Sequence, residues 1–148
     1  MVSFNRIPKS TLYSEIEEEA TQKWQKEWEN CTKAAVTKQF FPNVQDRLKL
    51  KINVTPNFTA MVIGHGKTRA YLHRFKIMEH ATCPCNEGDQ TIDQLLNQCT
   101  ILQTQTELPR NNVLKPGNWQ TASKEELIKK HLKLFIIFTK SIDFEKLS

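Results

Sequence analysis

The sequence has few residues that favour sheets or membrane spans. Only four glycines and two tyrosines occur among 148 residues, while Lys, Glu, Gln and Leu are abundant. This mixture favours helix over sheet. The longest uncharged apolar run is Leu134–Thr139, far shorter than the roughly 20 residues of a transmembrane helix. Because no apolar stretch follows a basic start, a secretory signal is not expected. We expect an intracellular protein of the nucleus or cytoplasm, without membrane contact.

The cysteines are too few for a disulfide scaffold. There are four, and Cys83, Cys85 and Cys99 lie close together in the sequence. In a reducing compartment such a cluster indicates a metal site or the remnant of one. Thiolates on a tight loop, joined by another on a following helix, suit tetrahedral zinc, which takes about four ligands. His80, just before the loop, is the candidate fourth ligand, whereas Cys31 is expected to pack as a small hydrophobe.

Positive charge is concentrated in the middle of the chain. The net charge is +5, and residues 33–80 hold nine basic and two acidic side chains. A block of this kind predicts a surface that binds a polyanion such as RNA or DNA. The alternative is an ordinary solvated surface rich in lysine.

Apolar periodicity predicts helices along the chain. A stripe of residues spaced by three or four indicates a long helix that starts near Ser10 or Ser14 and ends before Pro42. The stripe consists of Leu12, Ile16, Ala20, Trp24, Trp28, Cys31 and Ala35. Large aromatic residues at helical spacing usually pack in a core. We therefore expect Trp24 and Trp28 to anchor this helix.

Several shorter helices are predicted from their first residues. Thr55-Pro56 is a typical start, with a capping side chain followed by proline. A helix over residues 67–77 is expected to turn Phe75 inward. Thr91 is expected to open a helix over Ile92–Leu102, and Ser123 with Glu126 forms a capping box for a helix reaching about Lys140.

Basic and aromatic side chains alternate in the segment after Gly64. In such a segment the cationic side chains can bind phosphates and the aromatic rings between them can stack on bases. The sequence places no Ser or Asp partner beside His65 or His73, so a catalytic role is not expected for either histidine. The candidate nucleic-acid-binding residues are Lys67, Arg69, Tyr71, His73, Arg74 and Lys76.

These patterns predict an all-α fold of five to six helices, with a long N-terminal helix and a small cysteine-bearing knuckle. We divide the chain into a helical segment over residues 1–42 and a basic segment with the knuckle over 43–108. A linker containing Pro109, Pro116 and Gly117 is expected over residues 109–122, followed by a C-terminal helical segment over 123–148.

The order of the motifs resembles a known family. The run Ile63–Lys76, then Cys83-Pro-Cys85 and Leu95-Leu-x-x-Cys99, is similar to the C-terminal region of jockey-like non-LTR retrotransposon polyproteins. The stretch from Arg6 through Trp28 resembles the part of those polyproteins that follows the RNase H domain. The resemblance implies a nucleic-acid-binding tail of a reverse transcriptase polyprotein, with the other domains of the parent polyprotein as partners.

Two departures from the family pattern bear on function. Gln94 stands where the family usually has histidine, so the implied zinc site has lost one ligand; either His80 replaces it or the site has lost useful affinity. The chain also has no Tyr-x-Asp-Asp polymerase motif and no carboxylate set for RNase H chemistry, so we expect no enzymatic activity of its own.

Two other interpretations stay open. The face that carries Trp24 and Trp28 can make the chain an interaction module that docks on the RNase H or polymerase domains. The chain can also be a decayed copy of the element with no activity.

Overall fold

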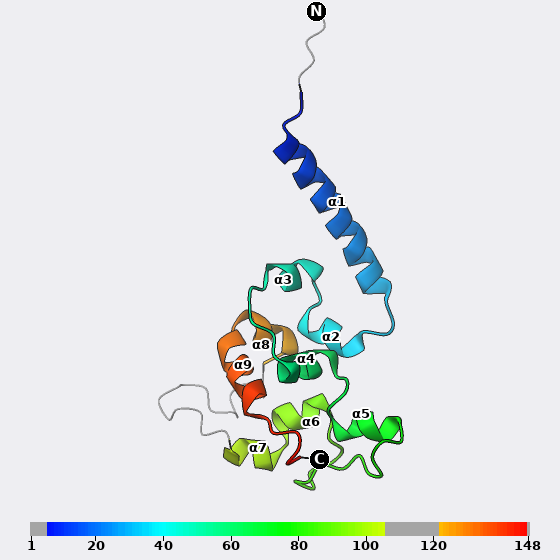
Figure 1. Ribbon diagram of the computed structural model, residues 1–148, viewed down its shortest axis with the longest axis vertical. Helices are drawn as coiled ribbons and strands as arrows, with labels where there is room; N and C mark the ends of the chain where they lie inside the picture. Colours follow the sequence, from blue (N-terminus) through cyan, green and yellow to red (C-terminus); the bar gives the residue numbers. More distant parts are fainter. Residues whose placement is uncertain (1–5, 106–121, 148) are drawn as a thin grey trace, which may run out of the picture.

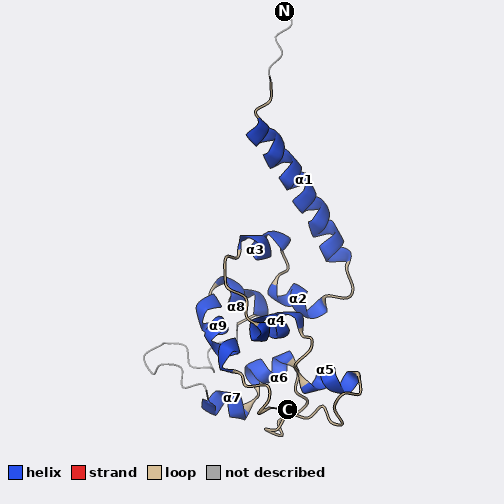
Figure 2. Cartoon of the chain, in the orientation of Figure 1, coloured by secondary structure: helices blue, strands red, loops and turns tan. Residues whose placement is uncertain are grey.

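The computed structural model describes residues 6–105 and 122–147, and these residues form an all-α fold without a strand. The helices pack as a compact group of short segments below one long projecting helix (Figures 1 and 2). In order they are α1 (Lys9–Asn30), α2 (Ala35–Phe40), α3 (Val44–Lys49), α4 (Pro56–Ile63), α5 (Arg69–Arg74), α6 (Ile92–Asn97), α7 (Thr100–Gln105), α8 (Lys124–Lys129) and α9 (Leu132–Ser141). The predicted fold class is confirmed, but the helices are shorter and more numerous than expected. None of those described has the length and apolarity needed to cross a membrane.

The expected long N-terminal helix is divided in two. α1 ends at Asn30, and Cys31 has an extended backbone. The Lys38 side chain on α2 donates to the carbonyl oxygens of Glu29 and Cys31. A lysine in this place satisfies the last carbonyls of α1 and carries the charge that a helix C-terminus favours. The predicted stripe is therefore broken, since Ala35, its last member, lies on a separate helix, α2, and is exposed.

The predicted first residues of the helices agree with the structure better than the predicted last residues. The Thr55 side chain accepts a hydrogen bond from the Phe58 amide at the first turn of α4, and both bonds of the Ser123–Glu126 capping box are present. The helix expected to reach Lys140 is interrupted between α8 and α9. The linker predicted over residues 109–122 lies almost entirely outside the described residues.

The core joins the middle of the chain to its C-terminal part. Phe135 of α9 is fully buried and contacts the rings of Phe40 on α2 and Phe58 on α4. Its ring is stacked on Phe40 at 5.5 Å between centroids and meets Phe58 of α4 edge-on at 5.6 Å. These three rings hold α2, α4 and α9 together, with α8 packed against α2.

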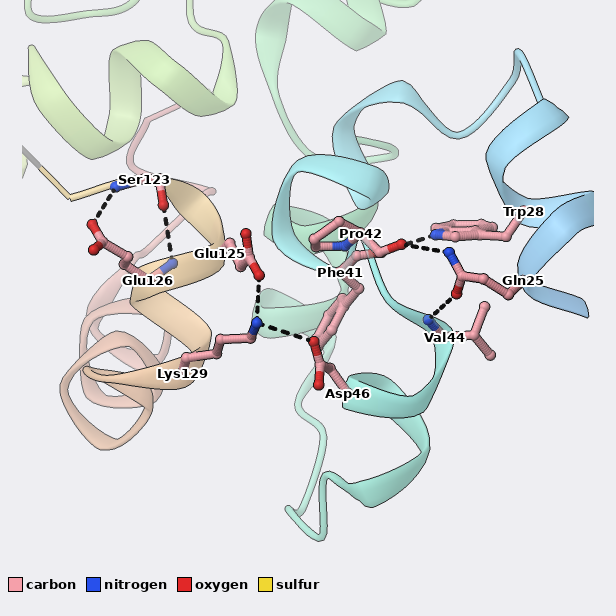
Figure 3. A network of polar contacts seen from close by, with 10 residues as sticks. All are labelled: Gln25, Trp28, Phe41, Pro42, Val44, Asp46, Ser123, Glu125, Glu126 and Lys129. Atoms are coloured by element: carbon pink, nitrogen blue, oxygen red, sulfur yellow. Dashed lines mark hydrogen bonds and ion pairs between the residues drawn. The ribbon is translucent and has the colours of Figure 1, made fainter. Parts of the chain in front are cut away.

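The C-terminal half of α1 is tied to this core (Figure 3). The Trp28 indole donates to the Phe41 carbonyl at 2.9 Å. The Gln25 amide donates to the Pro42 carbonyl at 3.1 Å and accepts from the Val44 amide at 2.9 Å. Across the same region, Lys129 of α8 forms ion pairs with Glu125 and, at 3.4 Å, with Asp46 of α3.

The N-terminal half of α1 projects away from the helical group (Figure 1). Leu12 is 48% exposed and Ile16 54%, and Trp24 in the C-terminal half of α1 is 50% exposed. The expectation that both tryptophans anchor the helix therefore holds for the half-buried Trp28 and is wrong for Trp24. Trp24 lies at the edge of a pocket that it lines with Trp28 and Phe41, so its ring contacts the core on one side and stays open to solvent on the other.

Candidate metal centre and nucleic-acid surface

The loop between α5 and α6 is folded tightly around Cys83 and Cys85. The Cys83 amide donates to the Gly88 carbonyl at 2.8 Å, and the Asn86 amide donates to the Cys83 carbonyl at 2.9 Å. Asn86 and Gly88 both have positive φ angles, 63° and 116°, a conformation that asparagine and glycine tolerate best. The turn chemistry of this segment thus forms the predicted knuckle.

The third thiol comes from the junction of α6 and α7. Cys99 lies immediately before α7, and its Sγ is 3.8 Å from that of Cys83. The sulfur atoms of Cys83, Cys85 and Cys99 all lie within 4.8 Å of one another. Cys83 and Cys99 are buried, and Cys85 is half-buried. The three cysteines are therefore close enough to hold a metal ion.

The surroundings shift the pKa values of two of these thiols in opposite directions. Burial raises the pKa of Cys99 to about 12, although a backbone hydrogen bond from Leu102 opposes it. Burial also acts to raise the pKa of Cys85, but hydrogen bonds from the Glu87 backbone and from the neighbouring thiols outweigh it and lower the pKa below the ordinary value. An ion would favour the thiolate form of each cysteine, because the thiolate is the ligand.

Two glutamine side chains touch the sulfur atoms of the cluster. The Gln94 Nε2 is 3.0 Å from the Cys85 Sγ, and the Gln90 Nε2 is 3.7 Å from the Cys83 Sγ. Sequence reasoning marked Gln94 only as a departure from the family pattern and missed Gln90. Gln94 is 3% exposed, and its Oε1 is buried without a hydrogen-bond partner among the described residues. The three sulfur atoms are soft donors of the kind that zinc prefers, and the Gln94 amide faces them through its Nε2.

The histidine expected to complete the site lies elsewhere. The side chain of His80 is 74% exposed, and its Nε2 is 3.9 Å from a carboxylate oxygen of Glu79. The structure does not bring His80 into the group formed by the three sulfur atoms.

Two of the predicted phosphate-binding residues make bonds within the protein. The Lys67 ammonium donates to Asn57 Oδ1 at 2.7 Å. The Arg69 guanidinium donates to the carbonyls of Leu147, at 3.0 Å, and Thr82, at 3.1 Å. Arg69 therefore helps to hold the C-terminal segment and the knuckle, whereas Lys67 is bonded to α4.

The aromatic residues of this segment form an open row on the surface. The Tyr71 ring is 4.9 Å from the His65 ring and 4.8 Å from the Phe75 ring, measured between centroids. Phe75 is 55% exposed, so the expectation that it points inward is wrong. α5 ends at Arg74, and Phe75, one helical turn after Tyr71, packs against that ring on the surface and does not enter the core.

Cations flank the exposed end of this row. The Arg74 guanidinium carbon is 6.0 Å from the Phe75 ring centroid. Lys76 has a positive φ of 58° and ends α5 by donating its amide to the His73 carbonyl. A ring nitrogen of His73 is 3.2 Å from the Met78 carbonyl oxygen. His73, Arg74 and Lys76 are all exposed.

The described residues thus define an all-α protein with a three-thiol cluster and a separate row of aromatic and basic side chains. The chain is similar to retrotransposon polyproteins. It is 30% identical over 101 residues to the "Retrovirus-related Pol polyprotein from type-1 retrotransposable element R1" of Popillia japonica. It is 23% identical over 90 residues to the corresponding R1 2 polyprotein of Nasonia vitripennis. These matches confirm the resemblance to a non-LTR retrotransposon polyprotein that the motifs predicted.

The matches cover 63% and 60% of this chain but only 37% and 22% of the two relatives. The chain therefore corresponds to a limited part of each polyprotein. No protein-family model matches the chain, and no solved structure matches it.

Proposed function

We propose that the chain is a nucleic-acid-binding region of a non-LTR retrotransposon polyprotein and has no catalytic activity of its own. The observation that carries this proposal is the row of His65, half-buried Tyr71 and exposed Phe75, with the exposed Arg74 and Lys76 on either side of Phe75 in the sequence. The similarity to retrotransposon Pol polyproteins supports it.

The ligand class follows from the exposed ring. A base that stacks on Phe75 must be unpaired, so the surface suits single-stranded RNA or DNA, with stacking worth about 1–3 kcal/mol per base. Arg74 and Lys76 supply the phosphate contacts, and His73 is placed to join them. Lys67 and Arg69, already bonded to Asn57 and to backbone carbonyls, add positive potential and fix the position of α5.

The three cysteines are proposed to hold a structural zinc ion. When bound, zinc would supply a strong cross-link between Cys83 and Cys85 on the loop and Cys99 before α7. The loop also contacts Arg69 through the Thr82 carbonyl. Fixing the knuckle would therefore stabilise the N-terminal end of α5.

The test is the affinity for a short single-stranded RNA, measured by fluorescence anisotropy at several salt concentrations. The Arg74→Ala/Lys76→Ala protein is expected to have a shallower salt dependence, by about 0.7 in the log–log slope for each phosphate that it no longer neutralises. Phe75→Ala should weaken binding by about tenfold or more with little change in slope, because stacking involves no counterion release.

The matched control is Lys133→Ala/Lys140→Ala, which removes the same charge from exposed positions on α9. Equal losses of affinity in the two double variants would mean that net charge alone drives binding, and the proposed surface would then be wrong.

A second function is favoured by the exposed stripe on α1. Leu12, Ile16 and Trp24 present apolar side chains to solvent, which is the feature expected of an interaction module. In that case α1 docks on the RNase H or polymerase domains of the parent polyprotein. Ile16→Glu would then abolish co-purification with those domains and leave RNA affinity unchanged.

A further inference from the structure

We infer that Gln94 supplies the fourth ligand to the metal ion held by Cys83, Cys85 and Cys99, through its side-chain Oε1. The inference rests on the proposed zinc site and assigns its last position to a residue that is seldom a ligand. It differs from both sequence-based alternatives, which were replacement by His80 and loss of useful affinity.

The position of Gln94 is set by the start of α6. The Thr91 side chain accepts from the Gln94 amide at 3.2 Å, so Gln94 lies in the first turn of the helix. Its carbonyl accepts from the Cys99 amide at 2.8 Å, and its side-chain nitrogen is 3.0 Å from the Cys85 Sγ. Backbone and side chain of one residue therefore contact two of the three cysteines.

One end of the buried Gln94 amide has no partner, and exchanging the two ends of the amide lets its oxygen face the sulfur atoms. A buried acceptor without a partner costs about 1–3 kcal/mol, and buried polar groups in native proteins are nearly always bonded. Gln94 Oε1 is buried with no such partner among the described residues. The terminal torsion of glutamine is broad and roughly two-fold, so a half-turn of the amide places oxygen where nitrogen now faces the sulfur of Cys85.

The charge of the site also suits an amide ligand. Three thiolates already outweigh the two positive charges of zinc, and burying additional net charge is costly. A neutral oxygen completes four-coordination without adding charge. It is a weaker ligand for zinc than imidazole, which predicts moderate affinity.

The competing residue is poorly placed. His80 is exposed and close to Glu79, so binding by its imidazole would require the chain before Cys83 to fold back onto the cluster. Gln94 reaches Cys85 without any backbone movement.

The experiment measures metal binding in the absence of nucleic acid. Reduced, metal-free protein is titrated with Zn²⁺ against a chromophoric chelator, and with Co²⁺ to record the visible d–d bands of the thiolate-bound ion. Gln94→Leu, which keeps the volume and removes the oxygen, should lower the Zn²⁺ affinity by about tenfold or more and shift the Co²⁺ bands. The matched control His80→Ala should change neither quantity, and Gln94→His should raise the affinity.

A measurement on the unaltered protein avoids dependence on the folding of a variant. With glutamine labelled at its side-chain ¹⁵N, the Gln94 amide signal should move strongly on Zn²⁺ addition, well beyond the signal of Gln98. Three results would overturn the inference: equal affinity and spectra for the native and Gln94→Leu proteins, loss of affinity in His80→Ala, or no Zn²⁺ binding by the native chain. RNA affinity is measured separately, so failure of the proposed function would be seen independently.

Discussion

Replacing Gln90 by leucine should destabilise the protein because this side chain connects three parts of the site. Gln90 is 1% exposed. Its Oε1 accepts from the Arg69 amide at 2.9 Å, and its Nε2 donates to the Leu147 carbonyl at 3.0 Å and faces the Cys83 sulfur at 3.7 Å. One amide thus links the start of α5, the C-terminal segment and the cysteine loop.

The loss of stability can be estimated from the hydrogen-bond partners that Gln90→Leu leaves behind. Gln90→Leu leaves the Arg69 amide without its acceptor, which costs about 1–3 kcal/mol, toward the lower end because Arg69 is only half-buried. The Leu147 carbonyl keeps its bond from the Arg69 guanidinium, so removal of the Gln90 bond there costs about 0.5–1.5 kcal/mol. We expect a total decrease of about 2–3 kcal/mol in the free energy of unfolding.

Urea denaturation of the reduced, metal-free protein measures this decrease. Gln98→Leu makes the same substitution at an exposed position beside α6 and should change stability by less than about 0.5 kcal/mol. If the Gln90→Leu and Gln98→Leu proteins unfold at the same urea concentration with the same slope, the connecting role of Gln90 is refuted.

Two further changes test other parts of the structure. Trp28→Ala should lower the free energy of unfolding by about 3 kcal/mol, because it removes a half-buried ring and its bond to the Phe41 carbonyl. Trp24→Ala should lower it by less than about 1 kcal/mol. Similar losses for both variants in urea denaturation would contradict the projecting position of α1. Burial raises the pKa of Cys99 from 9.0 to about 12, so the folded, metal-free protein holds this proton more tightly than the unfolded chain. The resulting stability is present below about pH 9 and lost toward pH 12. The Tm should therefore fall over this range, and it should fall less in Cys99→Ala; an identical fall in both proteins would exclude this thiol as the cause.

Local signals allowed the helix starts to be predicted. Thr55 and Ser123 each bond an amide only three residues away, so their role depends on sequence neighbours alone. The all-α class followed from composition, and the grouping of three cysteines from their spacing around a loop and a helix.

The features that could not be predicted depend on contacts distant in the sequence or on a single turn. α1 ends where Lys38 of the next helix reaches its carbonyls, and periodicity carries no information about that contact. Phe75 packs against Tyr71, one helical turn before it, and stays exposed. Neutral glutamine is not a residue type that a search for metal ligands selects, so the contact between Gln94 and Cys85 became visible only in three dimensions.

The central claim is that the row formed by Tyr71 and Phe75 contacts unpaired bases, and photochemical cross-linking tests it most directly. The native chain is irradiated with a single-stranded RNA that carries a photoreactive uridine, and the cross-linked residues are identified by mass spectrometry. The account predicts cross-links at Tyr71 or Phe75, which disappear when excess unlabelled RNA competes. Cross-links confined to α1 or α9, with none between His65 and Lys76, would contradict it.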